Sequence, residues 1–195
     1  MAIYLIRHAQ SVANVNGRAQ SHASIELTEV GHLQAQQLLT QLPTAHAIYI
    51  SIFLRTYQTA QYLIQRDQIQ PVIHPIEEFS YLSDLRCKNT LLEERKPWVD
   101  QYWGLLDIDY QDGEDAESFR SFYHRVKDFG EHLKKVQNAF QAQSLMVFSH
   151  GQFLTLFKMV HEQNRLLGVT LMKDFRQAMI DHPIKNTEYN LLKSL

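Results

Sequence analysis

The sequence is poor in cysteine, glycine and net charge, and each shortage argues against a class of protein. Cys87 is the single cysteine among 195 residues, so no disulfide can form within the chain, and we expect a reducing, cytoplasmic location. The formal net charge of −2 gives no electrostatic reason to expect a nucleic acid or an anionic membrane as a partner. The seven glycines form no glycine-rich phosphate loop, so nucleotide binding of the P-loop type is not predicted.

Long apolar runs and metal-ligand spacings are also missing. No apolar stretch is long enough to span a bilayer, and Met1 leads into a predicted strand without a basic leader, so we expect a soluble protein that binds no membrane. The ten histidines are scattered, and His124 and His132 lie eight residues apart, which does not make a helical pair of zinc ligands. We therefore expect no metal and no cofactor. No Gly-x-Ser-x-Gly elbow indicates a serine hydrolase.

Short apolar runs that alternate with amphipathic segments predict an α/β protein. The predicted strands cover residues 3–6, 47–51, 72–73 and 145–148, with an edge strand near 187–191. The predicted helices cover residues 28–42, 53–65, 116–142 and 171–180, with another directly after residue 151. This order predicts a three-layer α/β/α sandwich, in which a mainly parallel sheet has helices on both faces.

The length suits a single domain over residues 1–195. Residues 76–115 differ from the rest because they are rich in aromatic and charged side chains. We interpret them as an insertion of helices and loops that packs over the active site, and call them the insertion below. Its aromatic residues Trp98, Tyr102 and Trp103 either form a wall for the substrate or pack the insertion down, and packing is the favoured interpretation.

Three of the predicted strands end in polar residues of the same kind. The first ends in Arg7-His8, the second at Ser51, four residues before Arg55, and the fourth in Ser149-His150-Gly151. Because ligands of parallel sheets bind beyond the carboxyl ends of the strands, we expect two arginines and two histidines to share one crevice. Such a cluster would repel itself without an anion, and a phosphoryl group fits it, since each guanidinium can bind two oxygens.

The motifs that carry these residues resemble those of the histidine phosphatase superfamily, the phosphoglycerate mutase-like proteins. Arg7-His8-Ala9-Gln10 is similar to the first signature, with Ala9 in place of the usual glycine. Residues 51–60, Ser-x-x-x-Arg-Thr-x-Gln-Thr-Ala, resemble the second motif, and Ser149-His150-Gly151 resembles the third. Order and approximate spacing agree over residues 3–60 and 113–155. Ser24 stands where the family often has aspartate.

The resemblance implies a phosphatase that needs no metal. His8 would attack phosphorus and form a phosphohistidine, while Arg7, Asn14, Arg55 and His150 bind the phosphate, and water would then release it. Further candidates beside the motifs are Ser11, Gln20 and Gly151. The implied partner is a small phosphorylated molecule, and a phosphate or sulfate ion is expected in the site. The oligomeric state is not predicted.

The family's general acid is a glutamate soon after the third strand, which makes Glu78 the first candidate and Glu77 the second. Two alternatives to a phosphatase stay open. A mutase would return the phosphoryl group to a substrate, whose carboxylate Arg86, Lys88 and Arg95 could bind. A binding module would hold a phosphate or a phosphoprotein without turnover.

Overall fold

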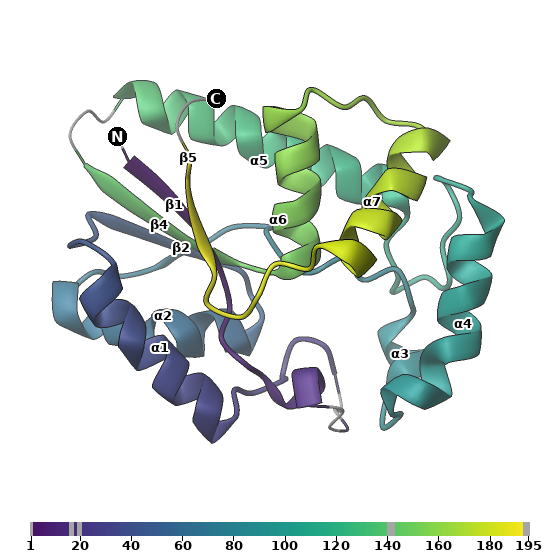
Figure 1. Cartoon of the computed structure of the whole chain (residues 1–195), viewed down its shortest axis with the longest axis horizontal. Coiled ribbons are helices and arrows are strands. Elements are labelled where there is room, and N and C mark those ends of the chain that lie inside the picture. Colours follow the sequence, from purple (N-terminus) through teal and green to yellow (C-terminus); the bar gives the residue numbers. More distant parts are fainter. Residues whose placement is uncertain (1, 16–17, 19–20, 140–142, 193–195) are drawn as a thin grey trace.

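The computed structural model describes residues 2–15, 18, 21–139 and 143–192. Its centre is a five-stranded sheet with the order β3-β2-β4-β1-β5 (Figure 1). The strands are β1 (Ala2–Arg7), β2 (Ala47–Ile50), β3 (Val72–Ile73), β4 (Ser144–Ser149) and β5 (Tyr189–Leu192). The first four run parallel, and β5 pairs antiparallel with β1 at the edge. The predicted mainly parallel sheet and its edge strand are confirmed.

Helices cover both faces of this sheet, which confirms the three-layer sandwich. Figure 1 shows α1 and α2 on one face and α5, α6 and α7 on the other. The helices are α1 (Glu29–Gln41), α2 (Leu54–Asp67), α3 (Asp84–Cys87), α4 (Leu92–Leu105), α5 (Phe119–Ala139), α6 (Gly151–Phe157) and α7 (Val169–Asp181). A 3₁₀ turn (Val12–Val15) follows β1, and a π-helical turn (Lys158–Glu162) continues α6.

Burial on both faces explains the unbroken apolar character of the inner strands. Ile3 and Leu5 of β1 belong to the core under α5, α6 and α7. Ile6 instead packs in a second core with Leu38 of α1 and Leu63 of α2. Successive strand residues point to opposite faces, so a strand between two helical layers needs apolar residues at every position.

Helix boundaries agree with the local signals and differ where those signals are weak. Thr28 is the N-cap of α1, and its Oγ1 accepts a hydrogen bond from Gly31 N at 3.0 Å, as its residue type predicts. The long helix α5 begins at Phe119, three residues after its predicted start. Its predicted end at 140–142 lies outside the described residues.

The insertion contains α3 and α4, which lie beyond the carboxyl ends of the parallel strands (Figure 1). The three aromatic residues considered for a substrate wall, Trp98, Tyr102 and Trp103, pack against the core and do not line the pocket described below. Tyr102 is buried, with its ring centroid 6.1 Å from that of Phe79, while Trp98 and Trp103 lie against the same core. In the part of the chain that the structure describes, no helix combines the length and apolarity needed to cross a membrane.

Candidate active site

The strand order brings the three polar strand ends together, since β4 lies between β1 and β2. Arg7 pairs in register with Ser149, and the amide of the next residue, His8, donates to the Ser149 carbonyl at 2.9 Å. Ser51 Oγ lies 2.8 Å from His150 Nε2. The predicted convergence is therefore present: Arg7, His8 and Arg55 line one crevice, and His150 is buried beside it, with its ring centroid 5.1 Å from that of His8.

The His8 ring is held in a single tautomer by two contacts. Its Nδ1 lies 2.7 Å from the Ala9 carbonyl, which can only accept, so Nδ1 carries the proton. Arg55 Nε donates to His8 Nε2 at 3.3 Å, which requires a lone pair on Nε2. Both contacts therefore leave His8 with an unprotonated Nε2, the form that acts as a nucleophile.

The environment of His8 keeps the ring neutral. Burial, followed by the charges of Arg55 and Arg7, lowers the pKa of His8 well below its ordinary value of 6.5, while the bond to Ala9 acts in the opposite direction. The side chain is only 2% exposed. His8 is therefore a neutral imidazole at neutral pH, with its one proton on Nδ1.

Arg55 lies in the first turn of α2 and is also buried, at 5% exposure. Its Nη1 donates to the His22 carbonyl at 2.7 Å, and its Cζ lies 4.7 Å from the centroid of the Phe53 ring. Burial lowers its pKa to about 10, with Glu78 raising it and Arg7 lowering it, so the guanidinium stays charged at neutral pH. This places a permanent cation directly beside the nucleophilic nitrogen.

Two further donors of the site have no hydrogen-bond partner among the described residues. They are Arg7 Nε and, in the tautomer whose Nε2 accepts from Ser51 Oγ, His150 Nδ1; both atoms are buried. Arg7 Nη1 does donate to the Ile184 carbonyl, which fixes the side chain. Gly151 keeps the space beside Arg7 open, since a Cβ there would lie 3.4 Å from Arg7 Nε. Buried donors without acceptors are costly, and an anion would satisfy both.

Burial, followed by the charge of Arg55, also lowers the pKa of His150 well below its ordinary value. At neutral pH two neutral imidazoles, His8 and His150, therefore lie near the charged guanidinium of Arg55.

Asn14 and Ser11 form the rim of the crevice after β1. The Asn14 Oδ1 accepts from Ser11 N at 3.0 Å, from Ser11 Oγ at 3.1 Å and from Asn186 Nδ2 at 3.2 Å. Because Oδ1 is occupied in this way, the amide nitrogen of Asn14 is the group left to contact a ligand. Gln20, another sequence candidate, lies outside the described residues.

The two candidate glutamates lie in different surroundings. Glu78 lines the pocket, where its Oε1 accepts from Gln152 N at 2.8 Å. Glu77 does not line it. Its Oε2 lies 3.4 Å from Arg125 Nη1, and the same arginine also forms an ion pair with Glu117. Only Glu78 can therefore reach a ligand in the pocket.

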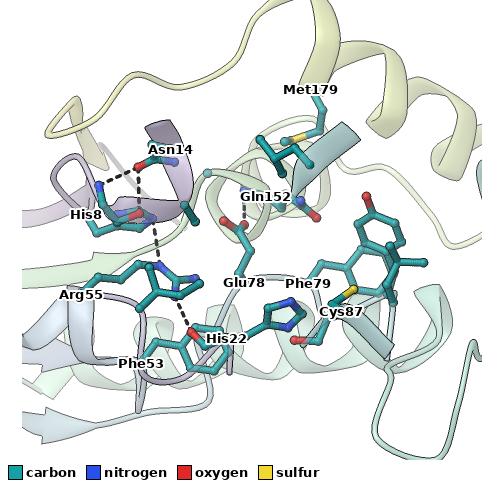
Figure 2. Close-up of a pocket in the computed structure, with 18 of the residues that line it drawn as sticks. His8, Asn14, His22, Phe53, Arg55, Glu78, Phe79, Cys87, Gln152 and Met179 are labelled. Atoms are coloured by element: carbon teal, nitrogen blue, oxygen red, sulfur yellow. Dashed lines mark hydrogen bonds between the residues drawn. The ribbon is translucent and has the colours of Figure 1, made fainter. Parts of the chain in front are cut away.

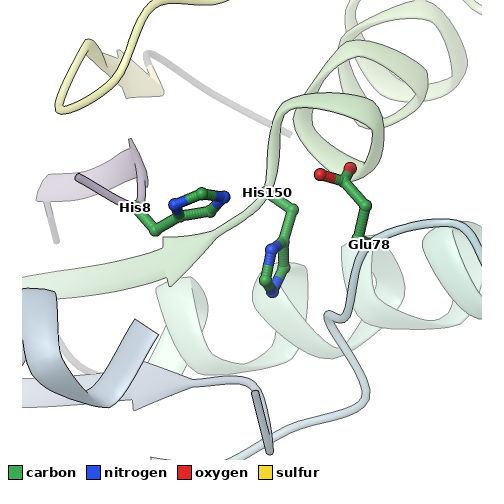
Figure 3. Close-up of side chains that lie close together, drawn as sticks. All are labelled: His8, Glu78 and His150. Atoms are coloured by element: carbon green, nitrogen blue, oxygen red, sulfur yellow. The ribbon is translucent and has the colours of Figure 1, made fainter. Parts of the chain in front are cut away.

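His8, Glu78 and His150 lie close together (Figure 3), with one ligand-type atom from each within 4.8 Å of the others. Imidazole and carboxylate groups at this separation are typical metal ligands. Two guanidiniums beside them oppose a divalent cation, however, and the unpartnered Arg7 Nε is a hydrogen-bond donor, which cannot coordinate a metal. The charges and hydrogen-bond donors of this cluster therefore suit an anion better than a metal ion.

The crevice opens into a pocket of about 430 Å³ (Figure 2). Beyond the cationic end its lining is mostly apolar and comes partly from the insertion, including Phe79, Leu82 and Cys87. Of the three basic residues that could bind the carboxylate of a mutase substrate, only Arg95 lines the pocket. Arg86 Nη1 instead lies 2.5 Å from Asp112 Oδ1 in an ion pair. Lys88 is exposed to solvent and does not line the pocket.

The sequence-based prediction missed several contributors to this pocket. His22 comes from the polar loop after β1, and Met179 and Ile184 from α7 and the segment that follows it. Met179 continues the apolar face of α7 four residues after Phe175, whereas His22 and Ile184 belong to no periodic pattern and reach the site through contacts distant in sequence. Only their positions in the folded chain reveal them.

Comparison with known proteins shows what the chain as a whole is similar to. The model of the histidine phosphatase superfamily (branch 1) matches residues 3–178. Phosphoserine phosphatase 1 of Hydrogenobacter thermophilus is 31% identical over 158 residues, covering 76% of this chain and 70% of that protein. The adenosylcobalamin/alpha-ribazole phosphatase of Escherichia coli K12 is 28% identical over 167 residues, covering 80% and 76%.

Solved structures show the same fold. The alpha-ribazole phosphatase of Shigella flexneri superposes with a TM-score of 0.71 at 23% identity, covering 97% of this chain and 88% of that one. A mycobacterial glucosyl-3-phosphoglycerate phosphatase gives a TM-score of 0.70 at 18% identity, covering 96% and 87%. At these identities the likeness establishes the fold alone.

Proposed function

The chain belongs to the histidine phosphatase superfamily (branch 1), and on this premise we propose that it is a phosphomonoesterase that works through a phosphohistidine on His8. It would act on a small phosphorylated substrate, without a metal, and as a single domain. The observation that carries the proposal is the unprotonated His8 Nε2, which lies 3.3 Å from a buried, charged guanidinium.

The first chemical step forms a bond between His8 Nε2 and phosphorus while the bond from phosphorus to the alcohol oxygen breaks. Arg55, Arg7 Nε and His150 Nδ1 would donate to the phosphoryl oxygens. A neutral His150 suffices for this role, because Ser51 can donate to its Nε2 and leave the proton on Nδ1. Catalysis then comes from positioning and charge stabilisation.

Glu78 is the proposed acid. It would protonate the leaving alcohol and then take a proton from the water that attacks the phosphohistidine, which releases inorganic phosphate and restores His8. Its place in the pocket supports this role, whereas Glu77 is held by Arg125.

The alcohol part of the substrate would lie against the apolar lining. The names of the relatives give the first compounds to try: phosphoserine and alpha-ribazole phosphate. The cytoplasmic location expected from the cysteine content remains part of this proposal.

The experiment that tests the function measures phosphate release from these two compounds and from phenyl phosphate, with and without EDTA, for the wild type and for His8→Ala. We expect release that EDTA leaves unchanged and that His8→Ala abolishes. Equal rates in the two proteins would leave only the binding-module alternative. Conversion of 3-phosphoglycerate to 2-phosphoglycerate, with 2,3-bisphosphoglycerate as phosphoryl donor and without phosphate release, would instead indicate a mutase.

A further inference from the structure

The orientation of Arg55 depends on one carbonyl group. Among the described residues, the only oxygen that accepts a hydrogen bond from Arg55 is the carbonyl of His22, 2.7 Å from Nη1. No carboxylate of the described chain lies within ion-pair distance of this arginine. Its Nε points to His8 instead. Whatever holds His22 in place therefore also fixes the direction of the guanidinium.

His22 is held by the carboxylate of Asp84, which belongs to the insertion. One oxygen, Asp84 Oδ1, accepts from the His22 amide at 2.8 Å and lies 3.3 Å from the His22 ring Nδ1. The two side chains are 25% and 33% exposed, so solvent only partly screens the pair. The next residue, Ala23, accepts from Leu54 N at 2.9 Å, which ties the loop to the start of α2.

Asp84 is not needed to hold its own helix. It is the first residue of α3, but other groups satisfy the free amides there. Ser83 Oγ accepts from Arg86 N at 3.2 Å, and Asp115 Oδ2 accepts from Leu85 N at 2.9 Å. The Asp84 carboxylate binds across to His22 instead, so its removal would leave these contacts at the start of α3 intact.

We infer that Asp84 is a positioning residue for the reaction, acting through His22 on Arg55. The inference rests on the phosphate-binding role proposed above for Arg55. The insertion would then have two roles. Its side chains line the part of the pocket proposed for the alcohol of the substrate, and Asp84 fixes the arginine proposed to bind the phosphate. Most other arginines of the described chain are oriented by a carboxylate, whereas Arg55 is oriented by a carbonyl whose loop is held by a charge-assisted contact with α3.

The test measures binding of inorganic phosphate by calorimetry, a readout that does not depend on turnover. We expect Asp84→Ala to weaken phosphate binding about tenfold, a loss within the range of coupling between contacting groups. Asp84→Asn keeps an oxygen acceptor for the His22 amide and is expected within about threefold of the wild type. The matched control is Asp115→Ala, which disturbs the same helix but removes no hydrogen bond or ion pair to His22, and it should leave phosphate binding unchanged.

A double-mutant cycle separates positioning from a merely structural role. In an Arg55→Ala background, Asp84→Ala should change phosphate binding less than twofold, because its effect passes through the missing side chain. Equal losses in Asp84→Ala and Asp115→Ala, additive losses in the cycle, or failure of Asp84→Ala alone to fold would each overturn the inference. If the wild type binds phosphate but hydrolyses no ester, the proposed function fails, while the inference that Asp84 positions Arg55 for phosphate binding still stands.

Discussion

Replacing Arg55 by alanine should slow catalysis strongly and change its pH dependence at the same time. The change removes a buried donor fork that lies 3.3 Å from the nucleophilic nitrogen, where solvent cannot screen its charge. Removal of one preorganised donor to a developing anion costs about 3 kcal/mol, which corresponds to a factor of about 150 in kcat/KM. Arg7 and His150 remain, so the loss should not be complete.

The pH effect follows from the pKa of His8. The charge of Arg55 is the second cause, after burial, that lowers this pKa below 6.5. Without that charge the pKa rises, so His8 becomes protonated at a higher pH and loses its nucleophilic lone pair there. The acidic limb of the profile of kcat/KM against pH should therefore move to higher pH in Arg55→Ala.

The assay is hydrolysis of phenyl phosphate between pH 4 and 8, with thermal unfolding measured alongside. Loss of Arg55 leaves the His22 carbonyl without its donor, so we also expect stability to fall by about 1–3 kcal/mol. The control is Arg66→Ala at the other end of α2, where Arg66 pairs with Asp67 away from the pocket. A kcat/KM within tenfold of the wild type, or an acidic limb that stays in place, would refute the reasoning.

Three further predictions follow from the same structure. Glu78→Gln should lower kcat about 10²-fold for benzyl phosphate but much less for 4-nitrophenyl phosphate, whose leaving group needs no proton, and steady-state kinetics on both esters will measure this. His8 and His150 are buried and have lowered pKa values, so below pH 6.5 the unfolded chain binds protons more readily than the folded protein. The free energy of unfolding should therefore fall as pH drops below 6.5, by up to about 1.4 kcal/mol per pH unit for each histidine. Urea unfolding at pH 7.5 and 5.5 will measure this. Thr28→Ala should destabilise the protein by about 1 kcal/mol through loss of the N-cap bond to Gly31, again measured by urea unfolding, with unchanged kcat/KM.

Each of these has a clear contrary result. Equal losses on both esters would remove Glu78 from the role of acid. A stability that does not fall between pH 7.5 and 5.5 would mean that the two histidines take up protons as readily in the folded protein as in the unfolded chain. Unchanged stability in Thr28→Ala would show that water replaces the cap at no cost.

The sheet and the crevice could be predicted because they obey periodic and topological rules. Four apolar residues before Arg7 require burial on both faces, which a parallel sheet between helices provides. The polar residues at strand ends then meet at one edge of that sheet, as Arg7 and Ser149 do in register. The roles of these residues remain predictions until they are tested.

The insertion and the loops could not be predicted in the same way. Helix α4 contains Pro97 in its interior, a residue that normally argues against a helix, and no residue range was predicted for it. The contacts of His22 with Asp84 and of Arg7 with the Ile184 carbonyl join segments far apart in sequence, and no period marks them. Such contacts depend on how loops pack, which a single sequence does not encode locally.

The most direct test of the account is a search for the covalent intermediate. The wild type is mixed with radiolabelled substrate, quenched in denaturant at alkaline pH, where phosphohistidine survives, and digested for peptide mapping. We predict an acid-labile label on the peptide that contains His8, absent from His8→Ala and longer-lived in Glu78→Gln, where activation of the attacking water is impaired. Rapid turnover with no label on the protein, or a label on another residue, would contradict the account.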